Sequence, residues 1–306
     1  MKLGYFLPQM GRVANADNIV KVAREAETQG FDSVWVTDRL LYPVKPKTPY
    51  AASPDGMLPE AYKIVYEPLE ALTWAAAHTT KIGIGTSVLD MPFYNAILLA
   101  KRTATIDALS GGRLRLGLGQ GWSQDEYEAT DADASKRGKR STEFIEVLHE
   151  VWKNDPAEFD GKYFHLSKSH INPKPVQKPH PPIYLAAFAP AAMKRIAHHA
   201  DGWMPVAIPV PGMEQMWGAI KGMAKEAGRN PDELKLIVRG NMTVTDEPLG
   251  DDRWIFTGTW DQIKSDAQAV KGLGADELIL DPTFSRYGET VEGFLEAMGK
   301  VRGLAG

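Results

Sequence analysis

The chain has 306 residues, of which 43% are hydrophobic and 24% charged, and it contains no cysteine. The absence of cysteine excludes disulfide scaffolds, thiolate zinc sites, iron–sulfur clusters and cysteine nucleophiles. The net charge of −4 comes from 35 basic and 39 acidic residues without a long run of one sign, which disfavours a nucleic-acid binder.

Short apolar runs alternate with longer helical patterns along the chain. The predicted strands cover residues 2–7, 33–37, 81–88, 113–118, 182–187, 202–206, 234–244 and 277–280. The predicted helices cover residues 15–29, 67–77, 96–109, 141–151, 191–199, 212–227, 260–271 and 291–301. Because the strands are almost continuously apolar, they fit a parallel sheet that is buried on both faces.

An eightfold repeat of strand and helix over this length predicts a closed (β/α)8 TIM barrel, with residues 1–306 as one domain. A doubly wound open sheet is the alternative, because it contains the same strand–helix–strand units. Two insertion loops interrupt the repeat. Residues 40–66 follow a strand and are expected at the catalytic face of a barrel, whereas residues 155–178 follow a helix and are expected at the opposite face or along the side.

The start of the chain favours a cytoplasmic protein. The strand-like residues 2–7 follow Met1 directly, without the basic and apolar regions of a signal peptide. No apolar run approaches the roughly 18 residues that a membrane span needs. We therefore expect a small-molecule substrate and neither a membrane nor a nucleic-acid partner.

The side chains at the carboxyl ends of the predicted strands are the candidates for chemistry. None of them is a histidine, and the sequence lacks the H-E-x-x-H, G-x-S-x-G and P-loop motifs. This disfavours a serine–histidine hydrolase and a histidine-ligated metalloenzyme. Asp38, Asp90 and Asp281 could bind a hard cation, but such carboxylates more often form hydrogen bonds or cap helices. We expect no metal.

Residues 117–122 form the most glycine-dense strand end. They do not fit the dinucleotide fingerprint, because Trp122 stands where its third glycine would be. Two interpretations stay open: a tight turn that needs positive φ, or backbone brought close to a flat ligand. Aromatic residues at several strand ends and in residues 40–66 favour a large aromatic cofactor. These residues are Tyr42, Tyr50, Tyr62, Tyr66, Tyr94, Trp122 and Phe188.

Taken together, several segments resemble the bacterial luciferase-like superfamily of flavin and deazaflavin oxidoreductases, and most closely its F420-dependent branch. The resemblance is carried by residues 30–38, 81–89, 98–107, 109–122, 173–177, 181–184 and 201–203, in this order and spacing. It implies a luciferase-like TIM barrel, coenzyme F420 as cofactor with FMN as the alternative, and a homodimer packed through outer helices.

The resemblance also implies roles for individual residues. A non-prolyl cis peptide at Ser87–Val88 would support the cofactor ring. The implied cofactor-binding residues are Asp38, Ser87, Val88, Gln120, Gly121, Phe188 and Ala189. The implied catalytic residues are Asp38 and Trp122, and the implied substrate pocket contains Arg39, Tyr66 and Trp122. A helix cap or supporting partner is the alternative role for Asp38, and core packing is the alternative for Trp122.

Two positions depart from the sugar-phosphate dehydrogenases of this superfamily. Those enzymes have His at the position of Arg39 and Glu at the position of Trp122, so alcohol oxidation by their mechanism is not expected here. Arg39 stays protonated and cannot be a general base. It could bind an anionic substrate or the cofactor, but we expect it to pair with Asp38 on the surface.

The function implied by the resemblance is hydride transfer between deazaflavin C5 and a small organic substrate, with Asp38 or a bound water supplying a proton. An FMN-dependent monooxygenase is the first alternative. A non-catalytic protein that binds a flavin or F420 is the second.

Overall fold

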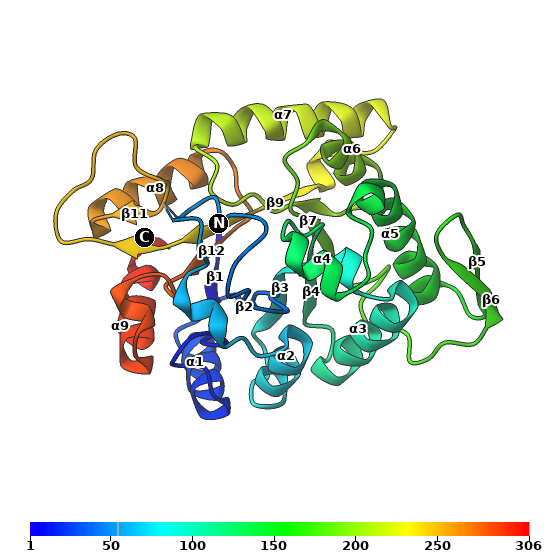
Figure 1. Cartoon of the computed structure of the whole chain (residues 1–306), viewed down its shortest axis with the longest axis horizontal. Helices are drawn as coiled ribbons and strands as arrows, with labels where there is room; N and C mark the ends of the chain where they lie inside the picture. The colour runs from blue at the N-terminus through cyan, green and yellow to red at the C-terminus, as the bar shows by residue number, and fades with distance from the viewer. Residues whose placement is uncertain (54, 306) are drawn as a thin grey trace.

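The computed structural model describes residues 1–53 and 55–305. Within these residues, parallel strands close into a barrel in the order β1-β12-β9-β8-β7-β4-β3-β2 (Figure 1). The barrel strands are β1 (Lys2–Phe6), β2 (Ser33–Val36), β3 (Gly83–Asp90), β4 (Leu114–Gly119), β7 (Ile183–Leu185), β8 (Gly202–Trp203), β9 (Lys235–Asn241) and β12 (Glu277–Asp281). Because β1 pairs with both β2 and β12, the TIM barrel is confirmed and the open-sheet alternative is wrong.

A helix follows every barrel strand, and the helices surround the barrel (Figure 1). They are α1 (Ala16–Thr28), α2 (Pro68–Ala77), α3 (Ala96–Ser110), α4 (Gln124–Ala129), α5 (Arg137–Lys153), α6 (Pro190–His199), α7 (Val210–Glu226), α8 (Trp260–Gly272) and α9 (Val291–Arg302). Asn15 and Thr259 cap α1 and α8 by accepting hydrogen bonds from backbone N–H groups of the first turn, which explains where these helices begin. No helix within the described residues is long and apolar enough to cross a membrane.

The structure differs from the predicted elements at a few places. The strand expected over residues 202–206 is regular only at Gly202–Trp203, and Val206 forms an isolated bridge with Arg239. Pro205 lies between them and has no N–H to donate to a strand ladder. The helix expected from residue 141 begins at Arg137, and the short helix α4 was not predicted.

The two insertions lie where their positions in the repeat predict. Residues 40–66, which we call the lid segment, contain the short helix η1 (Glu60–Lys63) and pack onto the mouth of the barrel through an aromatic cluster. This cluster contains Met10, Tyr42, Tyr50, Leu58, Tyr62, Val65, Trp122 and Phe284. The hairpin of β5 (Ala157–Asp160) and β6 (His165–Ser169) projects at the side of the molecule, beyond α5 (Figure 1).

Large side chains fill the barrel below its mouth. They belong to Phe6, Trp35, Tyr184, Met204, Ile237 and Ile279. The Trp35 ring fits because Gly4 and Gly85 face it, and a Cβ at either glycine would overlap the indole. The indole nitrogen of Trp35 donates hydrogen bonds to Ser33 and Glu277, and Glu277 also pairs with Arg115. The barrel is therefore a packed core, and ligands can bind only at its ends.

Candidate active site

A cavity of about 380 Å³ lies at the carboxyl ends of β3, β4 and β7. It is lined by Val88, Asp90, Gly119, Gln120, Gly121, Trp122, Arg137, Ala186, Ala187, Phe188, Ala189, Ala192 and Val206. Six of the residues predicted for the site are among them: Val88, Gln120, Gly121, Trp122, Phe188 and Ala189. The cavity thus joins residues that are up to about a hundred positions apart in the sequence.

A bulge in β3 forms one wall of this cavity. The register between β3 and β4 shifts between Thr86 and Leu89, and the Ser87–Val88 peptide bond is cis, which confirms the predicted isomer. The carbonyl oxygen of Ser87 accepts a hydrogen bond from Arg239 in the barrel interior. The Ser87 hydroxyl is buried and has no hydrogen-bond partner within residues 1–53 and 55–305. The side chain of Val88 faces the cavity.

The bulge explains the glycines of β4. A Cβ at Gly117 would overlap the carbonyl oxygen of Thr86, and a Cβ at Gly119 would lie 2.6 Å from Cγ2 of Val88. Gly121 has a positive φ of +69°, a conformation that favours glycine. Close packing of β4 on the β3 bulge therefore requires two of these glycines, and the turn interpretation applies to Gly121.

Two carboxyl groups meet at the edge of the cavity. Oδ2 of Asp38 accepts hydrogen bonds from the backbone N–H of Asp90 at 3.1 Å and from the Tyr94 hydroxyl at 2.9 Å. Oδ1 of Asp90 accepts a hydrogen bond from the backbone N–H of Gly121 at 2.8 Å. Asp90 is among the residues lining the cavity, whereas Asp38 is not. Asp38 therefore fits the alternative role of a supporting partner.

Burial changes the proton affinity of both groups. Burial, followed by the negative charge of Asp38, raises the pKa of Asp90 from 3.8 to about 8. Burial also raises the pKa of Asp38, although the hydrogen bonds from Asp90 and Tyr94 oppose this shift. A proton is therefore held by this pair at neutral pH.

The expected surface pair between Arg39 and Asp38 is wrong. The guanidinium of Arg39 forms an ion pair with Glu126 of α4, and the two side chains are only 6% and 1% exposed. The same guanidinium lies over the rings of Trp122 and Tyr62, 5.0 and 5.4 Å from their centroids. Arg39 thus links the lid segment, through Tyr62, to Glu126 of α4. Because α4 was not predicted from the sequence, the buried carboxylate of Glu126 was not expected beside Arg39.

The other predicted residues differ in their surroundings. Tyr66 is 45% exposed and its backbone pairs with Gln9, but it does not line the cavity. Gln120 lines the cavity, and its side-chain amide donates a hydrogen bond to the Ser141 hydroxyl at 3.1 Å. Phe188 lies at the rim and is 57% exposed. Tyr62 of η1, and not Tyr66, belongs to the aromatic cluster at the mouth of the barrel.

Several residues at or beside the cavity were not assigned to the site from the sequence, and they include Asp90, Glu126, Arg137 and Val206. Asp90 had a usable signal, because it is an acid at a strand end. Glu126 and Arg137 belong to α4 and α5, and no periodic pattern shows which side chains of these helices reach the barrel mouth. Within the described part of the chain, no group of three or more histidine or acidic side chains could hold a metal ion.

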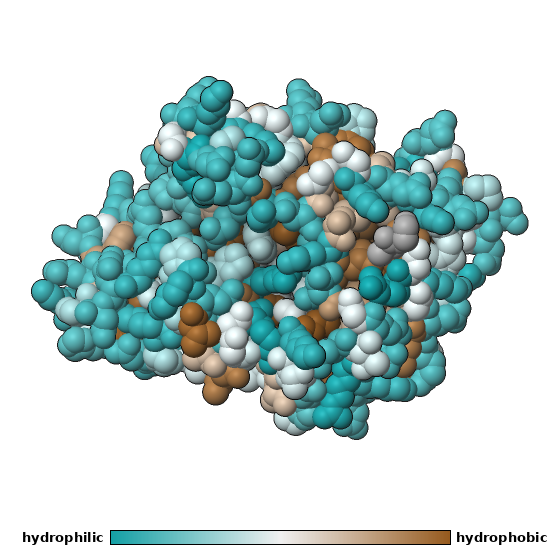
Figure 2. Space-filling view, turned by 180° about the vertical axis from the view of Figure 1, so that it is seen from behind, coloured by the Kyte–Doolittle hydropathy of each residue, from teal (hydrophilic) through white to brown (hydrophobic). Residues whose placement is uncertain are grey.

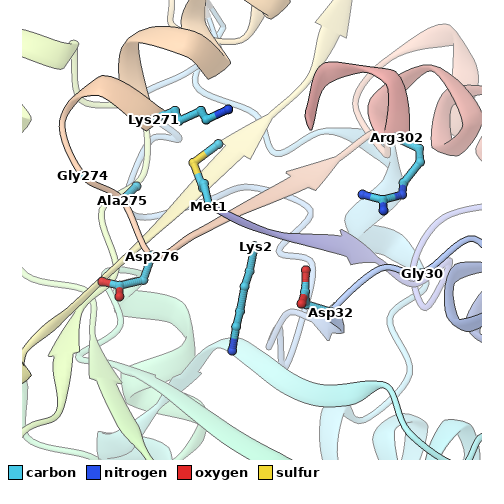
Figure 3. Close-up of a pocket in the computed structure, with 9 residues that line it drawn as sticks. All are labelled: Met1, Lys2, Gly30, Asp32, Lys271, Gly274, Ala275, Asp276 and Arg302. Atoms are coloured by element: carbon cyan, nitrogen blue, oxygen red, sulfur yellow. The ribbon is translucent and has the colours of Figure 1, made fainter. Parts of the chain in front are cut away.

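A wide hollow of about 1070 Å³ lies at the opposite end of the barrel, at the N-terminal ends of β1 and β12 (Figure 3). Its carboxylates are engaged with backbone groups: Asp32 accepts from the N–H of Leu3 at 2.9 Å, and Asp276 accepts from the N–H of Leu236 at 2.9 Å. Such contacts at the N-terminal face of a barrel serve its stability. We therefore place the active site at the other end.

Residues 1–277 match the profile of the luciferase-like monooxygenase family, so the chain belongs to this family. An uncharacterized protein of Mycobacterium tuberculosis is 33% identical over 244 residues, which are 77% of this chain and 82% of that protein. The F420-dependent glucose-6-phosphate dehydrogenase of Kineococcus radiotolerans is 28% identical over 261 residues, or 81% of this chain and 69% of that enzyme.

Among solved structures, the monooxygenase RslO1 from Streptomyces bottropensis superposes with a TM-score of 0.79 at 19% identity, covering 99% of this chain and 98% of that one. At this identity, the likeness shows the shared barrel fold. Family members are F420- or flavin-dependent oxidoreductases and monooxygenases.

Proposed function

We propose that this protein is an F420-dependent oxidoreductase that transfers a hydride between the deazaflavin C5 and a small organic substrate. The observation that carries the proposal is the cavity at the carboxyl end of the barrel, with the Ser87–Val88 bulge, Trp122 and Phe188 in its walls. The relative whose name includes F420 dependence supports the choice of cofactor.

The residues of the cavity fit a planar ring system. Its volume of about 380 Å³ is in the usual range for small-molecule sites. Val88, Trp122 and Phe188 offer apolar surfaces, and Gly121 lets the backbone come close without a side chain. Arg137 also lines the cavity and could bind an anionic part of the cofactor. When bound, the deazaflavin would supply two-electron hydride chemistry.

The protein's own contribution to the reaction is orientation, exclusion of water and a proton. The aromatic cluster packs the lid segment onto the mouth of the barrel beside Trp122, and we propose that it limits the access of water to the cavity. Asp90 holds a proton at the cavity wall, because burial and the charge of Asp38 keep its pKa near 8. We propose that Asp90 donates this proton when a substrate is reduced and that Asp38 positions it.

An FMN-dependent monooxygenase is the second candidate, because the same walls would accept an isoalloxazine ring. The experiment that separates the two is a paired titration of the purified protein with F420 and with FMN, followed by fluorescence. We expect micromolar or tighter binding of F420 and weak binding of FMN. The opposite preference would overturn the F420 assignment. Incorporation of one oxygen atom from O2 into a substrate in the presence of reduced FMN would establish the monooxygenase.

A non-catalytic binding protein is the third candidate. It would bind F420 but show no turnover with any substrate, whereas an enzyme shows many turnovers for each active site. The buried Asp90 at the cavity wall favours the enzyme, because a protonated buried carboxyl group serves acid–base chemistry better than binding alone.

We also propose that the protein forms a homodimer through its outer helices. An apolar groove of about 330 Å³ between α2 and α3 supports this proposal, with Leu98 and Leu109 57% and 73% exposed beside it. Figure 2 shows a mainly hydrophilic face on which apolar residues gather in separate patches. Light scattering of the purified protein tests the dimer. Two further points stay predictions from the sequence: that the protein is cytoplasmic and that residues 1–306 form a single domain.

A further inference from the structure

A second cavity of about 330 Å³ adjoins the first one at the mouth of the barrel. It is lined by Tyr50, Ala52, Pro59, Val206, Ala207, Asn241, Thr243, Trp254, Thr257 and Phe284. Val206 lines both cavities. The rings of Tyr50 and Trp122, one from each cavity, have their centroids 5.7 Å apart. The two cavities therefore adjoin at the mouth of the barrel, and the lid segment contributes Tyr50, Ala52 and Pro59 to the wall of the second one.

We propose that this second cavity binds the substrate, and that the substrate is an uncharged molecule with a flat apolar body and a carbonyl or hydroxyl oxygen. This inference rests on the proposed function, in which the first cavity holds the cofactor. It adds the substrate class and assigns a role to the segment before α8, which includes Trp254.

The chemistry of the walls excludes a charged substrate such as a sugar phosphate. None of the described residues that line the second cavity is charged, and three are large aromatic residues: Tyr50, Trp254 and Phe284. A phosphate transferred into such surroundings would lose its hydration without gaining an arginine or lysine partner.

The guanidinium groups of Arg39 and Arg239 already form ion pairs with carboxylates. Arg39 pairs with Glu126, and Arg239 pairs with Asp281 at 3.0 Å while it also donates to the carbonyl oxygen of Ser87. Neither cation is left to neutralise an anionic substrate. Binding an anion here would require a buried ion pair to break, which is costly.

Asn241 supplies a polar contact suited to a neutral oxygen atom. Its Oδ1 accepts a hydrogen bond from Nε of Arg239 at 3.0 Å. Because a guanidinium only donates hydrogen bonds, this contact fixes which side-chain atom of Asn241 is the oxygen and which is the nitrogen. Within residues 1–53 and 55–305, the structure records no acceptor for the Asn241 Nδ2 group. This nitrogen can therefore donate to a carbonyl or hydroxyl oxygen of the substrate.

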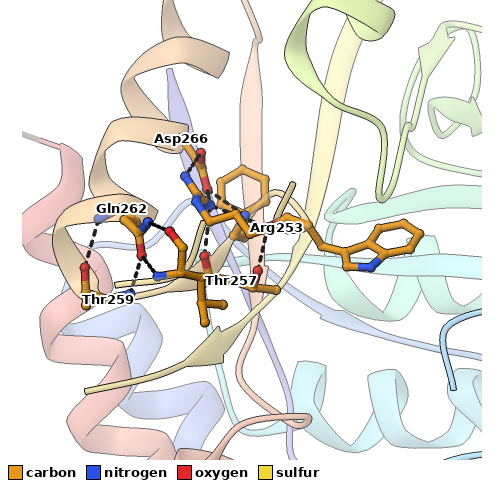
Figure 4. Close-up of polar contacts among 8 residues, drawn as sticks. Arg253, Thr257, Thr259, Gln262 and Asp266 are labelled. Carbon is orange, nitrogen blue, oxygen red and sulfur yellow. Dashed lines mark hydrogen bonds and ion pairs between the residues drawn. The ribbon is translucent and has the colours of Figure 1, made fainter. Parts of the chain in front are cut away.

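Arg253, which directly precedes Trp254 in the chain, is anchored to α8 through Asp266 (Figure 4). Arg253 donates two hydrogen bonds to Asp266 of α8, at 2.7 and 2.8 Å. The backbone N–H of Phe256 donates to the same carboxylate at 2.7 Å. Trp254 lies between these anchored residues, yet it is 58% exposed. An exposed indole on an anchored segment is a preorganised surface for an apolar ligand.

The proposal is tested by isothermal titration of the full chain with three probes: coumarin, naphthalene and glucose 6-phosphate. Coumarin is flat, neutral and carries a carbonyl group, and naphthalene has a similar body without oxygen. We expect coumarin to bind more tightly than naphthalene and glucose 6-phosphate not to bind. Equal or tighter binding of glucose 6-phosphate, or no binding of either neutral probe, would overturn the proposal.

Three variants locate the binding site. Trp254→Ala is expected to weaken coumarin binding about tenfold, whereas Trp74→Ala, which removes a 45% exposed indole from α2, should leave it unchanged. Asn241→Leu should weaken binding of coumarin but not of naphthalene, because only coumarin offers an acceptor. Unchanged coumarin affinity in Trp254→Ala or in Asn241→Leu would refute the assignment.

Titration of the same variants with F420 separates this inference from the proposed function. Trp254→Ala should bind F420 within about twofold of the unmodified protein, because Trp254 does not line the first cavity. If F420 fails to bind while coumarin binds and depends on Trp254, the cofactor assignment is wrong but the second cavity stands. If F420 binds and coumarin does not, the substrate class is wrong.

Discussion

The buried ion pair between Arg39 and Glu126 makes the lid segment sensitive to one substitution. Glu126→Gln would leave the Arg39 guanidinium without a counter-charge at a side chain that is 6% exposed. Removing one partner of a buried pair costs about 3–5 kcal/mol of folding free energy. Trp122 and Tyr62 still face the guanidinium, and the amide oxygen of Gln can accept from the N–H of Leu40, as Glu126 does at 2.9 Å. We therefore expect a loss near the lower end, about 3 kcal/mol.

The same two elements offer a matched control. Lys47 of the lid segment and Glu128 of α4 also form an ion pair, but their side chains are 53% and 49% exposed. Glu128→Gln should change stability very little, because exposed pairs are screened by solvent. The double variant with Arg39→Met and Glu126→Leu should recover most of the lost stability, since apolar residues of similar size can replace a buried pair.

The assay is urea unfolding followed by tryptophan fluorescence, together with hydrogen exchange of the lid segment. The reasoning would be refuted if Glu126→Gln lost less than about 1 kcal/mol, a value typical of an exposed pair, or behaved like Glu128→Gln. It would also be refuted if the double variant were as unstable as Glu126→Gln alone, because the cost would then not come from an unpaired buried charge.

Four further predictions concern the cavity, the barrel and the outer helices. Turnover in the reducing direction should fall as pH rises through about 8, because Asp90 loses its proton there. Asp90→Asn should lower kcat about 10²-fold or more and leave the affinity for F420 nearly unchanged. A flat pH–rate profile of the unmodified protein would contradict this role of Asp90. Because the folded pKa of Asp90 lies above 3.8, Asp90 makes the free energy of unfolding fall between pH 4 and 8 by about 1.4 kcal/mol per pH unit, a slope that calorimetry should find missing in Asp90→Asn. Gly117→Ala should lower the free energy of unfolding in urea by about 2 kcal/mol or more, because the new Cβ would overlap the Thr86 carbonyl. Gly218→Ala on α7, where a Cβ meets open space, should raise it by about 0.5–1 kcal/mol. Similar values for the two variants would contradict the packing argument. Leu109→Glu should halve the mass measured by light scattering, and an unchanged dimer would move the interface elsewhere.

The sequence by itself determined the barrel and indicated the end of the barrel at which the candidate site lies. Eight apolar runs separated by helical patterns specify a parallel sheet covered on both faces, and strand ends follow from where each run stops. The positions of the strand ends made Trp122 and Phe188 candidates for lining a pocket, whereas Val88 and Gly121 were assigned to the site through the family resemblance. The structure places all four at one cavity. The family resemblance added the cis peptide, which no periodic pattern could indicate.

Only the tertiary structure decided which groups face one another at that end. Asp38 and Asp90 are both acids at strand ends, but side-chain direction places Asp90 at the cavity and Asp38 behind it. Arg39 finds Glu126, 87 residues further along the chain, through a helix too short for its pattern to be recognised. Trp254 reaches the second cavity because Asp266 anchors its segment. Sequence periodicity reports which face of an element is buried, whereas contacts between distant loops depend on the closed three-dimensional arrangement.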